Sequence, residues 1–349
     1  NANKTLKLFE KVMVFEEGNF ISNLGFYRPF TSPSNELAKE LKKFSKEDIA
    51  AGLQTHCEIL VSSYIRYWIK KMGYKSKNIC LAGGVAANVR INQVISNIKG
   101  VDNIFVFPHM GDGGIPLGAA AYLNYNTSGK TKLKFDTAQL GIEYSDIDIM
   151  TKLQKYKKLL IIEKPKNYVN AVIEDLINAK VIGWFQGKME YGPRALGGRS
   201  ILFHAQDKTC NDWLNKRMNR TEFMPFGPVT PIDFAKECYI GFKENDLCTP
   251  YMTKTFHCKK SFIKNHPAVV HLDKTSRPQI VTPKRNGIYY KVLKGYCEKT
   301  GYRALINTSF NAHEEPIVYS PEDAVEGLLN NMIDILYIGS FKILKKGNK

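Results

Sequence analysis

The chain has 349 residues, of which 44% are hydrophobic, so it is long enough for two domains that each bury a core. No apolar run approaches the roughly 18 residues of a membrane span, and the start of the chain lacks the pattern of a secretory signal. Seven scattered cysteines without a CxxC pair are typical of reduced thiols. We therefore expect a cytoplasmic protein without membrane attachment.

The chain is strongly basic, with 50 Lys and Arg against 33 Asp and Glu and a net charge of +17. Such a balance is found in nucleic-acid binders. The lysines are spread along the chain, however, and no helix-turn-helix or RNP-like pattern stands out. We therefore do not expect nucleic acid as a partner, and we favour a basic surface around phosphate-bearing substrates.

The first long helix is predicted to begin after Ser45, since Asp48 stands at the third position of a capping box. Apolar residues at spacings of three and four continue to about Lys71. His56 lies on this apolar stripe, where a histidine is more often a packed core residue than a ligand.

A strand over Asn78–Ala82 is followed by the turn Gly83-Gly84 and by a helix from Asn88 to about Asn97. A strand, a glycine turn and a helix N-terminus in this order bring backbone donors and the helix dipole toward a phosphate. The pattern predicts nucleotide contacts at Gly83, Gly84 and Asn88.

The next strand, Asn103–Phe107, leads into Gly111-Asp112-Gly113-Gly114 and a further helix. Asp112 stands between glycines, so nothing bulky shields its carboxylate from a metal or a metal-bound phosphate. An aspartate there is also a common turn former, and the residues alone leave both interpretations open.

A polar stretch over residues 124–155 indicates a domain boundary, and we expect domains at 1–150 and 151–349. The second domain opens with a strand near 159–162, the helix Val169–Asn178 and the strand Val181–Phe185. Strand, helix and strand in about 30 residues predict an α/β unit.

The loop from Gly187 to Arg199 combines four glycines with Lys188, Arg194 and Arg199. Glycines let backbone N–H groups form a concave nest for an anion, and each arginine offers a planar fork. We expect an oxyanion site here. The alternative is an ordinary surface loop with solvated arginines.

Three later segments carry further candidates for the same anion site. Arg220 ends a basic helical stretch, Arg277 lies in the segment 267–279, and Asn307 and Ser309 follow the strand Ala304–Ile306. The alternatives are a solvated basic face and a turn that satisfies its own polar side chains. Beyond them we expect a helix capped by Ser320, a strand over Ile333–Ile338 and a frayed lysine-rich tail.

The loop 187–202 resembles the GxxExGPRALGxRS signature of the O-carbamoyltransferase family, which includes nodulation-type and antibiotic-tailoring enzymes. The segments 81–88, 111–120 and 306–318 resemble the same family in the same order, and the resemblance runs from about Asp48 to about Tyr337. The segment 267–279 resembles the family's HxDxTxRxQ strand, so we expect a strand there. It implies an α/β protein: the C-terminal half of an actin/hexokinase-like ATPase domain, then a domain similar to threonylcarbamoyl-AMP synthase that forms carbamoyl-adenylate.

The resemblance also implies ATP-dependent transfer of a carbamoyl group from carbamoyl phosphate, through carbamoyl-adenylate, to a hydroxyl of a small-molecule acceptor. Asp112 would bind a divalent metal, iron or magnesium. The implied catalytic residues are Arg194, Arg199, Arg277 and Ser309. The implied ATP-binding residues are Gly83, Gly84, Asn88, Gly113, Lys188, Arg220 and Asn307.

The sequence departs from the family pattern at several points. It contains no HxxxH motif, from which the family draws its other metal ligands, and we expect that it lacks the N-terminal part of the family. Gly227 replaces an alanine, and the chain has His313-Glu314 before Glu315-Pro316, where the family has a glycine before Glu-Pro. A split or truncated non-catalytic subunit that needs a separate N-terminal half, a homodimer and a tRNA threonylcarbamoyl-type enzyme therefore remain alternatives.

Overall fold

The computed structural model describes residues 2–26, 36–73, 77–129, 135–220 and 225–347. These residues form two compact units. Unit 1 comprises residues 1–80 and 90–105, and unit 2 comprises residues 81–89 and 106–349. This division by compactness differs from the expected sequence domains 1–150 and 151–349, which remain a prediction.

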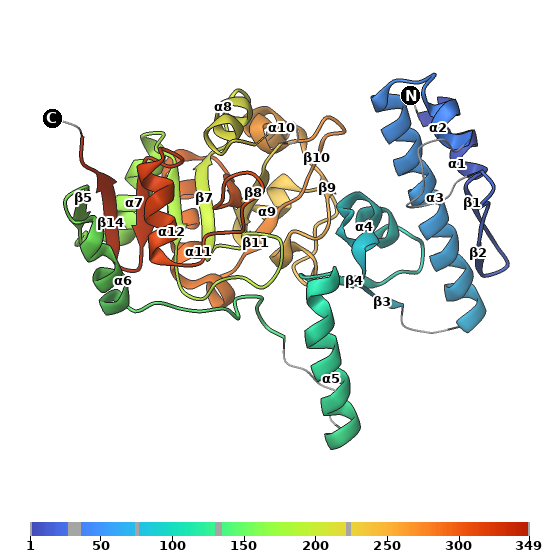
Figure 1. The fold of residues 1–349 in the computed structure, drawn as a ribbon, viewed down its shortest axis with the longest axis horizontal. Coiled ribbons are helices and arrows are strands. Elements are labelled where there is room, and N and C mark those ends of the chain that lie inside the picture. Colours follow the sequence, from blue (N-terminus) through green and yellow to red (C-terminus); the bar gives the residue numbers. More distant parts are fainter. Residues whose placement is uncertain (1, 27–35, 74–76, 130–134, 221–224, 348–349) are drawn as a thin grey trace. The chain divides into compact units, whose positions relative to one another are not determined.

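The helix α3 (Lys46–Met72) is the longest element of unit 1 (Figure 1). It begins where the sequence predicts, because the Ser45 side chain accepts a hydrogen bond from the Asp48 N–H. His56 is buried against Phe9, which confirms its assignment to the core. The other elements that lie wholly in this unit are η1 (Ala2–Lys4), α1 (Leu6–Glu10), β1 (Met13–Glu16), β2 (Asn19–Ser22) and α2 (Glu36–Leu41).

Two short strands, β3 (Asn78–Leu81) and β4 (Asn103–Val106), form a separate two-stranded sheet. Between them lie η2 (Gly84–Ala87) and α4 (Val89–Ser96), so the predicted order of strand, glycine turn and helix is confirmed. After β4 come η3 (Asp112–Gly114) and α5 (Ile115–Ser128), which is the further helix that the sequence predicts.

Unit 2 is built around a mixed sheet, which has eight strands among the residues that the structure describes (Figure 1). Its strand order is β11-β8-β12-β7-β6-β13-β14-β5. The pairs β11–β8 and β13–β6 are parallel, and the other pairs are antiparallel. The strands are β5 (Leu160–Glu163), β6 (Ile182–Phe185), β7 (Arg199–His204), β8 (Gly227–Pro231), β11 (Gln279–Val281), β12 (Leu305–Ser309), β13 (Ile335–Ile338) and β14 (Phe341–Lys345).

Helices cover both faces of this sheet, because neighbouring residues of a buried strand point to opposite sides. In β6, Ile182 and Trp184 belong to one buried core, whereas Val181 and Phe185 belong to the other. The first core is covered by α7 (Tyr168–Ile177) and α11 (Pro283–Thr300). The second is covered mainly by α6 (Asp146–Leu153), α8 (Cys210–Arg217), α9 (Ile232–Cys238), α10 (Lys260–Asn265) and α12 (Pro321–Leu329). The observed α/β architecture confirms the predicted fold class at this level.

Two expectations about the chain's later segments are wrong. The lysine-rich segment predicted to fray forms β14, because Phe341 and Ile343 are buried while the lysines between and after them point outward. Segment 267–279 is not one strand. It consists of η6 (Pro267–Val269), a turn at Lys274 with φ +63°, and the short strand β10 (Thr275–Ser276), which pairs with β9 (Phe256–His257).

The helix α12 begins as predicted, with Pro321 in its first turn and a capping box in which Ser320 and Asp323 exchange hydrogen bonds. All seven cysteines are free thiols. Across the described ranges, no helix has both the length and the apolar character needed to span a lipid bilayer.

His266 makes the stability of unit 2 dependent on pH. Its ring is 1% exposed and stacks on Phe262, and its Nε2 accepts the N–H of Arg303 at 2.9 Å. Burial lowers its pKa from 6.5 to about 4. Between these values the unfolded chain binds a proton that the folded chain does not, so stability falls as pH decreases from 6.5 toward 4.

We predict that His266→Gln removes this pH dependence, because the amide oxygen still accepts from the Arg303 N–H but cannot titrate. The slope that is lost in the free energy of unfolding is at most about 1.4 kcal/mol per pH unit. Urea unfolding of both proteins at pH 7.5, 6, 5 and 4.5 measures the difference. Parallel pH profiles for the wild type and the variant would contradict the prediction.

Candidate functional site

The glycine-rich loop between β6 and β7 is organised by a carboxylate of its own. Oε1 of Glu190, a residue that is 5% exposed, accepts hydrogen bonds from three backbone N–H groups. The donors are Leu196 at 2.7 Å, Gly198 at 2.6 Å and Arg199 at 3.1 Å. The predicted nest of donors therefore exists, but the anion that these three amides bind is Glu190, and an external anion at the other groups of the loop stays a prediction.

The carbonyl groups of the same loop are also held by buried side chains. Asn307 on β12 donates to the carbonyl of Ala195 at 3.0 Å and to the Gln279 side chain at 2.8 Å. Gln279 in turn donates to the carbonyl of Leu196 at 2.8 Å. The Trp184 indole donates to the carbonyl of Gly197 at 2.9 Å. The three accepting carbonyls belong to residues 195–197, which directly follow Arg194. The network therefore fixes the backbone next to the Arg194 side chain.

Arg199 lies inside the protein rather than facing a ligand. Its side chain is fully buried over the Phe185 ring, and it donates to the carbonyls of Gln186, Gly187, Gly198 and Ile142 at 3.0–3.3 Å. Burial lowers its pKa to about 10, and the nearby Glu190 carboxylate acts in the opposite direction, so it is charged at neutral pH. This geometry gives Arg199 a positioning role.

Lys188 and Arg194 differ from Arg199 in their surroundings. Lys188 is exposed and Arg194 is half-buried, on the segment that Glu190 and Asn307 hold from its two ends. The Arg194 side chain therefore projects from an ordered backbone, which reduces the entropy lost when such a cation binds an anion.

Arg220 and Ser309 are brought together at the carboxyl end of β12, as the sequence predicts for one site. The guanidinium donates to the Thr308 hydroxyl at 2.9 Å, the Ser309 hydroxyl at 2.8 Å and the Asn311 side-chain oxygen at 2.7 Å. In the register of the sheet, Ser309 pairs with Ser200, one residue beyond Arg199. The end of β12 and the glycine-rich loop are therefore neighbours.

Arg277 lies beside the first residue of β8. A side-chain carbon built on Gly227 would stand 3.2 Å from the Arg277 carbonyl oxygen and 3.7 Å from its Nη2, and only 2.2 Å from the Met252 methyl group. The glycine at this position thus leaves room for Met252. Because Gly227 pairs with Asn307, Arg277 lies on the same end of the sheet as Arg220.

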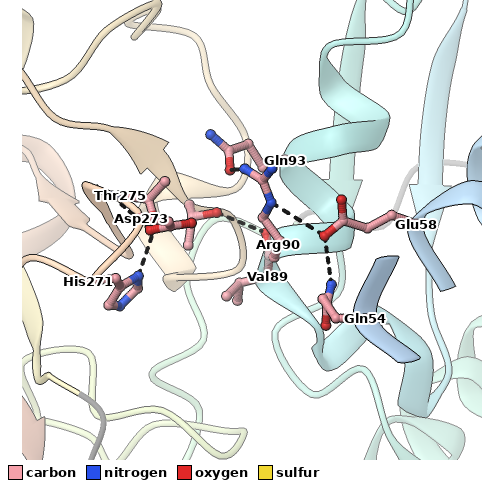
Figure 2. A network of polar contacts seen from close by, with 9 residues as sticks. Gln54, Glu58, Val89, Arg90, Gln93, His271, Asp273 and Thr275 are labelled. Carbon is pink, nitrogen blue, oxygen red and sulfur yellow. Dashed lines mark hydrogen bonds and ion pairs between the residues drawn. The ribbon is translucent and has the colours of Figure 1, made fainter. Parts of the chain in front are cut away.

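A short chain of hydrogen bonds precedes Arg277 (Figure 2). Thr275 donates its hydroxyl proton to Asp273 at 2.6 Å, so its oxygen accepts from Nδ1 of His271 at 3.0 Å. Burial lowers the pKa of His271, and the charge of Arg277 lowers it further against the opposing effect of Asp273. This ring is therefore neutral at pH 7, with its proton on Nδ1.

The glycine turn after β3 and the loop after β4 contact each other and the glycine-rich loop. The N–H of Gly83 donates to the Met110 carbonyl at 2.6 Å, and the Tyr191 hydroxyl donates to the Gly113 carbonyl. A side-chain carbon built on Gly83 or Gly84 would meet no described atom within 4 Å. The turn is thus open to the approach of a ligand.

Asp112 does not form a metal site with the residues around it. Its side chain is exposed in η3, and the described ranges contain no group of three or more His, Cys, Asp and Glu that could hold a metal ion. Within the described ranges, the implied iron or magnesium therefore lacks a fitting ligand set.

Sequence reasoning missed three residues that shape the site: Glu190, Tyr191 and Gln279. The signal for Glu190 was present, because it is the one acidic residue in a glycine-rich basic loop. Tyr191 and Gln279 gave no comparable signal, since their partners are 78 and 83 residues away in the chain.

We predict that Glu190→Ala unfolds the glycine-rich loop, because three buried N–H groups lose their acceptor at about 1–3 kcal/mol in each case. The expected result is a loss of several kcal/mol in the free energy of unfolding. Hydrogen exchange should become faster at the amides of Leu196, Gly198 and Arg199. Denaturant unfolding and exchange monitored by mass spectrometry measure both effects.

Glu190→Gln is the matched control, because its amide oxygen can still accept from the same donors. It should recover most of the lost stability. An unchanged exchange rate in Glu190→Ala would show that another group holds these amides.

Comparisons with known proteins match two successive segments of this chain to one family. A sequence model described as "Carbamoyltransferase N-terminus" matches residues 1–121, and one described as "Carbamoyltransferase C-terminus" matches residues 173–345. An uncharacterized protein of Methanocaldococcus jannaschii is 33% identical over 89% of this chain and 51% of its own length. The nodulation protein NolNO of Sinorhizobium fredii is 31% identical over 97% of this chain and 50% of its own.

Among solved structures, full-length HypF in a phosphate- and nucleotide-bound form is 17% identical, with a TM-score of 0.38. It covers 59% of this chain and 31% of its own. Escherichia coli YciO is 14% identical with a TM-score of 0.35, over 49% of this chain and 77% of its own. The chain spans about half the length of the curated relatives reported above. The two family matches, with relatives among the nodulation proteins, show that this chain belongs to the carbamoyltransferase family.

Proposed function

We propose that the chain takes part in ATP-dependent O-carbamoylation, with residues 151–349 forming carbamoyl-adenylate from carbamoyl phosphate and ATP. The carbamoyl group then passes to a hydroxyl of a small-molecule acceptor. The chain spans about half the length of each of these relatives. In this proposal the complete reaction therefore needs a protein of the relatives' length, or an assembly of this chain with a second chain or a second copy.

The atoms of this reaction balance when one water molecule enters. Water cleaves the phosphorus–oxygen bond of carbamoyl phosphate and yields carbamate and phosphate. A carbamate oxygen then attacks the α-phosphorus of ATP, and the bond to pyrophosphate breaks. In the last step the acceptor oxygen attacks the carbamoyl carbon, AMP leaves, and the hydroxyl proton passes to solvent. Each step brings several negative charges together.

The observation that supports this proposal most is the gathering of cations at one end of the unit 2 sheet. Arg220 lies at the carboxyl end of β12, Arg277 lies beside the first residue of β8, and Arg194 directly precedes Ala195, whose carbonyl Asn307 holds. Fixed cations at such a place stabilise the charge of a phosphoryl-transfer transition state without reorganisation. In this proposal Lys188 joins them as a mobile cation.

The remaining site residues have supporting roles in the proposal. Arg199 and Glu190 hold the loop together with the two N–H donors of Asn307, whereas the Oδ1 of Asn307 and the hydroxyl of Ser309 orient the planar carbamoyl group. Positioning and charge stabilisation carry the catalysis, and no covalent enzyme intermediate forms.

The glycine turn supplies the second half of the proposal. We infer that Gly83, Gly84, Asn88 and Gly113 contact ATP or the adenylate in what is the C-terminal part of an actin/hexokinase-like domain. The open space above Gly83 and Gly84 supports this, because only a residue without a side chain lets backbone and phosphate approach closely.

We predict that the chain releases pyrophosphate from ATP only when carbamoyl phosphate is present. Arg194→Ala and Arg277→Ala should each slow this release by roughly 100-fold or more, because each removes a cation that acts in the transition state. A coupled pyrophosphate assay measures the rate.

Arg303→Ala is the matched control, since Arg303 pairs with Glu237 on the surface and should leave the rate unchanged. Equal rates in the wild type and both site variants would remove the adenylation site. Pyrophosphate release that requires threonine and bicarbonate instead of carbamoyl phosphate would favour a tRNA threonylcarbamoyl-type enzyme.

A further inference from the structure

A second cluster of cations lines a hollow in unit 1, apart from every residue used above. The hollow has a volume of about 500 Å³. Its charged lining residues are Arg66, Lys70, Lys77 and Lys99, and we call this hollow the basic pocket. Ile69, Gly73 and Ile98 complete its lining.

The four cations come from separate places in the chain. Arg66 and Lys70 lie on the last turns of α3, Lys77 immediately precedes β3, and Lys99 follows α4. Backbone bonds from Asp102 to Lys77 and from Phe107 to Leu81 show that β3 and β4 run in the same direction. The basic pocket therefore lies at the amino ends of these strands, whereas Gly83 follows the carboxyl end of β3.

The side chains of these cations form no ion pair within the described part of the chain. Many lysines elsewhere do, for example Lys152 with Glu322 and Lys342 with Asp175. The nearby carboxylate of Asp102 accepts the backbone N–H of Lys77 at 3.0 Å. Like charges that gather around a shared hollow repel one another, so an anion bound there gains from all four.

The backbone at Gly100 accommodates one of these cations. Gly100 has φ +92°, and a side-chain carbon built on it would lie 3.0 Å from Nζ of Lys77. The ammonium group therefore rests against bare backbone beside the hollow, where any larger residue would displace it.

A structural explanation accounts for only part of the cluster. The carboxyl end of α3 carries a partial negative charge, which stabilises cations in its last turn, such as Lys70. Lys99 lies three residues beyond the carboxyl end of α4, so the same effect reaches it in part, whereas Lys77 immediately precedes β3 and gains little from it. The isoleucines add an apolar wall that an exposed basic face does not need.

We propose that the basic pocket is a binding site for a nucleoside phosphate, with the phosphates among the four cations and the ring system against Ile69 and Ile98. A volume of about 500 Å³ falls within the range of small-molecule sites. This site is distinct from the anion site at β12 and does not depend on the proposed function.

The test is calorimetric titration of the full chain with ATP, pyrophosphate and adenosine. To weaken ATP binding at the proposed adenylation site, the titrations are made in an Arg194→Ala/Arg277→Ala background, and the basic pocket is identified as the ATP site that is lost with Lys77 and Lys99 while any site at the glycine turn is kept. ATP should bind there, pyrophosphate more weakly, and adenosine not at all. Adding Lys77→Ala and Lys99→Ala should weaken ATP binding at least tenfold, and raising the salt concentration should do the same in the parent. Gly100→Ala should also weaken binding, by displacing the Lys77 ammonium without removing a charge.

Lys39→Ala/Lys42→Ala is the matched control, because it removes two charges from unit 1 outside the lining of the pocket. Thermal unfolding verifies that all variants fold. ATP affinity that survives Lys77→Ala/Lys99→Ala, or falls equally in the control, would overturn the proposal. Binding of RNA without binding of ATP would overturn it as well. None of these outcomes depends on whether Arg194 and Arg277 serve adenylation.

Discussion

One carboxylate oxygen of Glu190 accepts hydrogen bonds from three backbone N–H groups, and the rest of the site depends on this interaction. Glycines make this turn possible, since Gly192 and Gly197 have positive φ angles that other residues adopt at a cost. The buried charge is tolerated because the three donors and the nearby Arg199 stabilise it. The backbone of the loop is thus held by buried groups, and Arg194 lies half-buried on it.

Sheet register turns this local arrangement into a site. Asn307 holds the loop from β12, and the same strand ends at Ser309, which binds Arg220. β8 lies next to β12 and places Arg277 nearby. Residues that are more than 100 positions apart in sequence therefore share one end of the sheet. A chain without this register would leave the same cations dispersed in solvent.

The sequence was sufficient wherever the determinant is local. The caps at Ser45 and Ser320, the glycine turn after β3 and the buried strand β6 follow from a few neighbouring residues. The sequence was insufficient where contacts with residues far away in the chain determine the role of a side chain. In the sequence, Arg194 and Arg199 looked equally able to bind an anion. The Arg199 guanidinium instead donates to backbone carbonyls, one of which belongs to the distant Ile142. The strand β14 was missed because its lysines suggested a solvated tail. Its buried and exposed residues in fact alternate, as expected for a strand that pairs with β13.

The central claim is that Arg194, Arg220 and Arg277 bind one anion while Arg199 holds the loop from within. The most direct measurement is a titration of carbamoyl phosphate into protein with ¹⁵N-labelled arginine, observed at the side-chain Nε resonances. We expect the first three to shift along one saturable curve and the Arg199 resonance to stay in place. Independent, non-saturable shifts of the three, or a dominant shift at Arg199, would contradict the account.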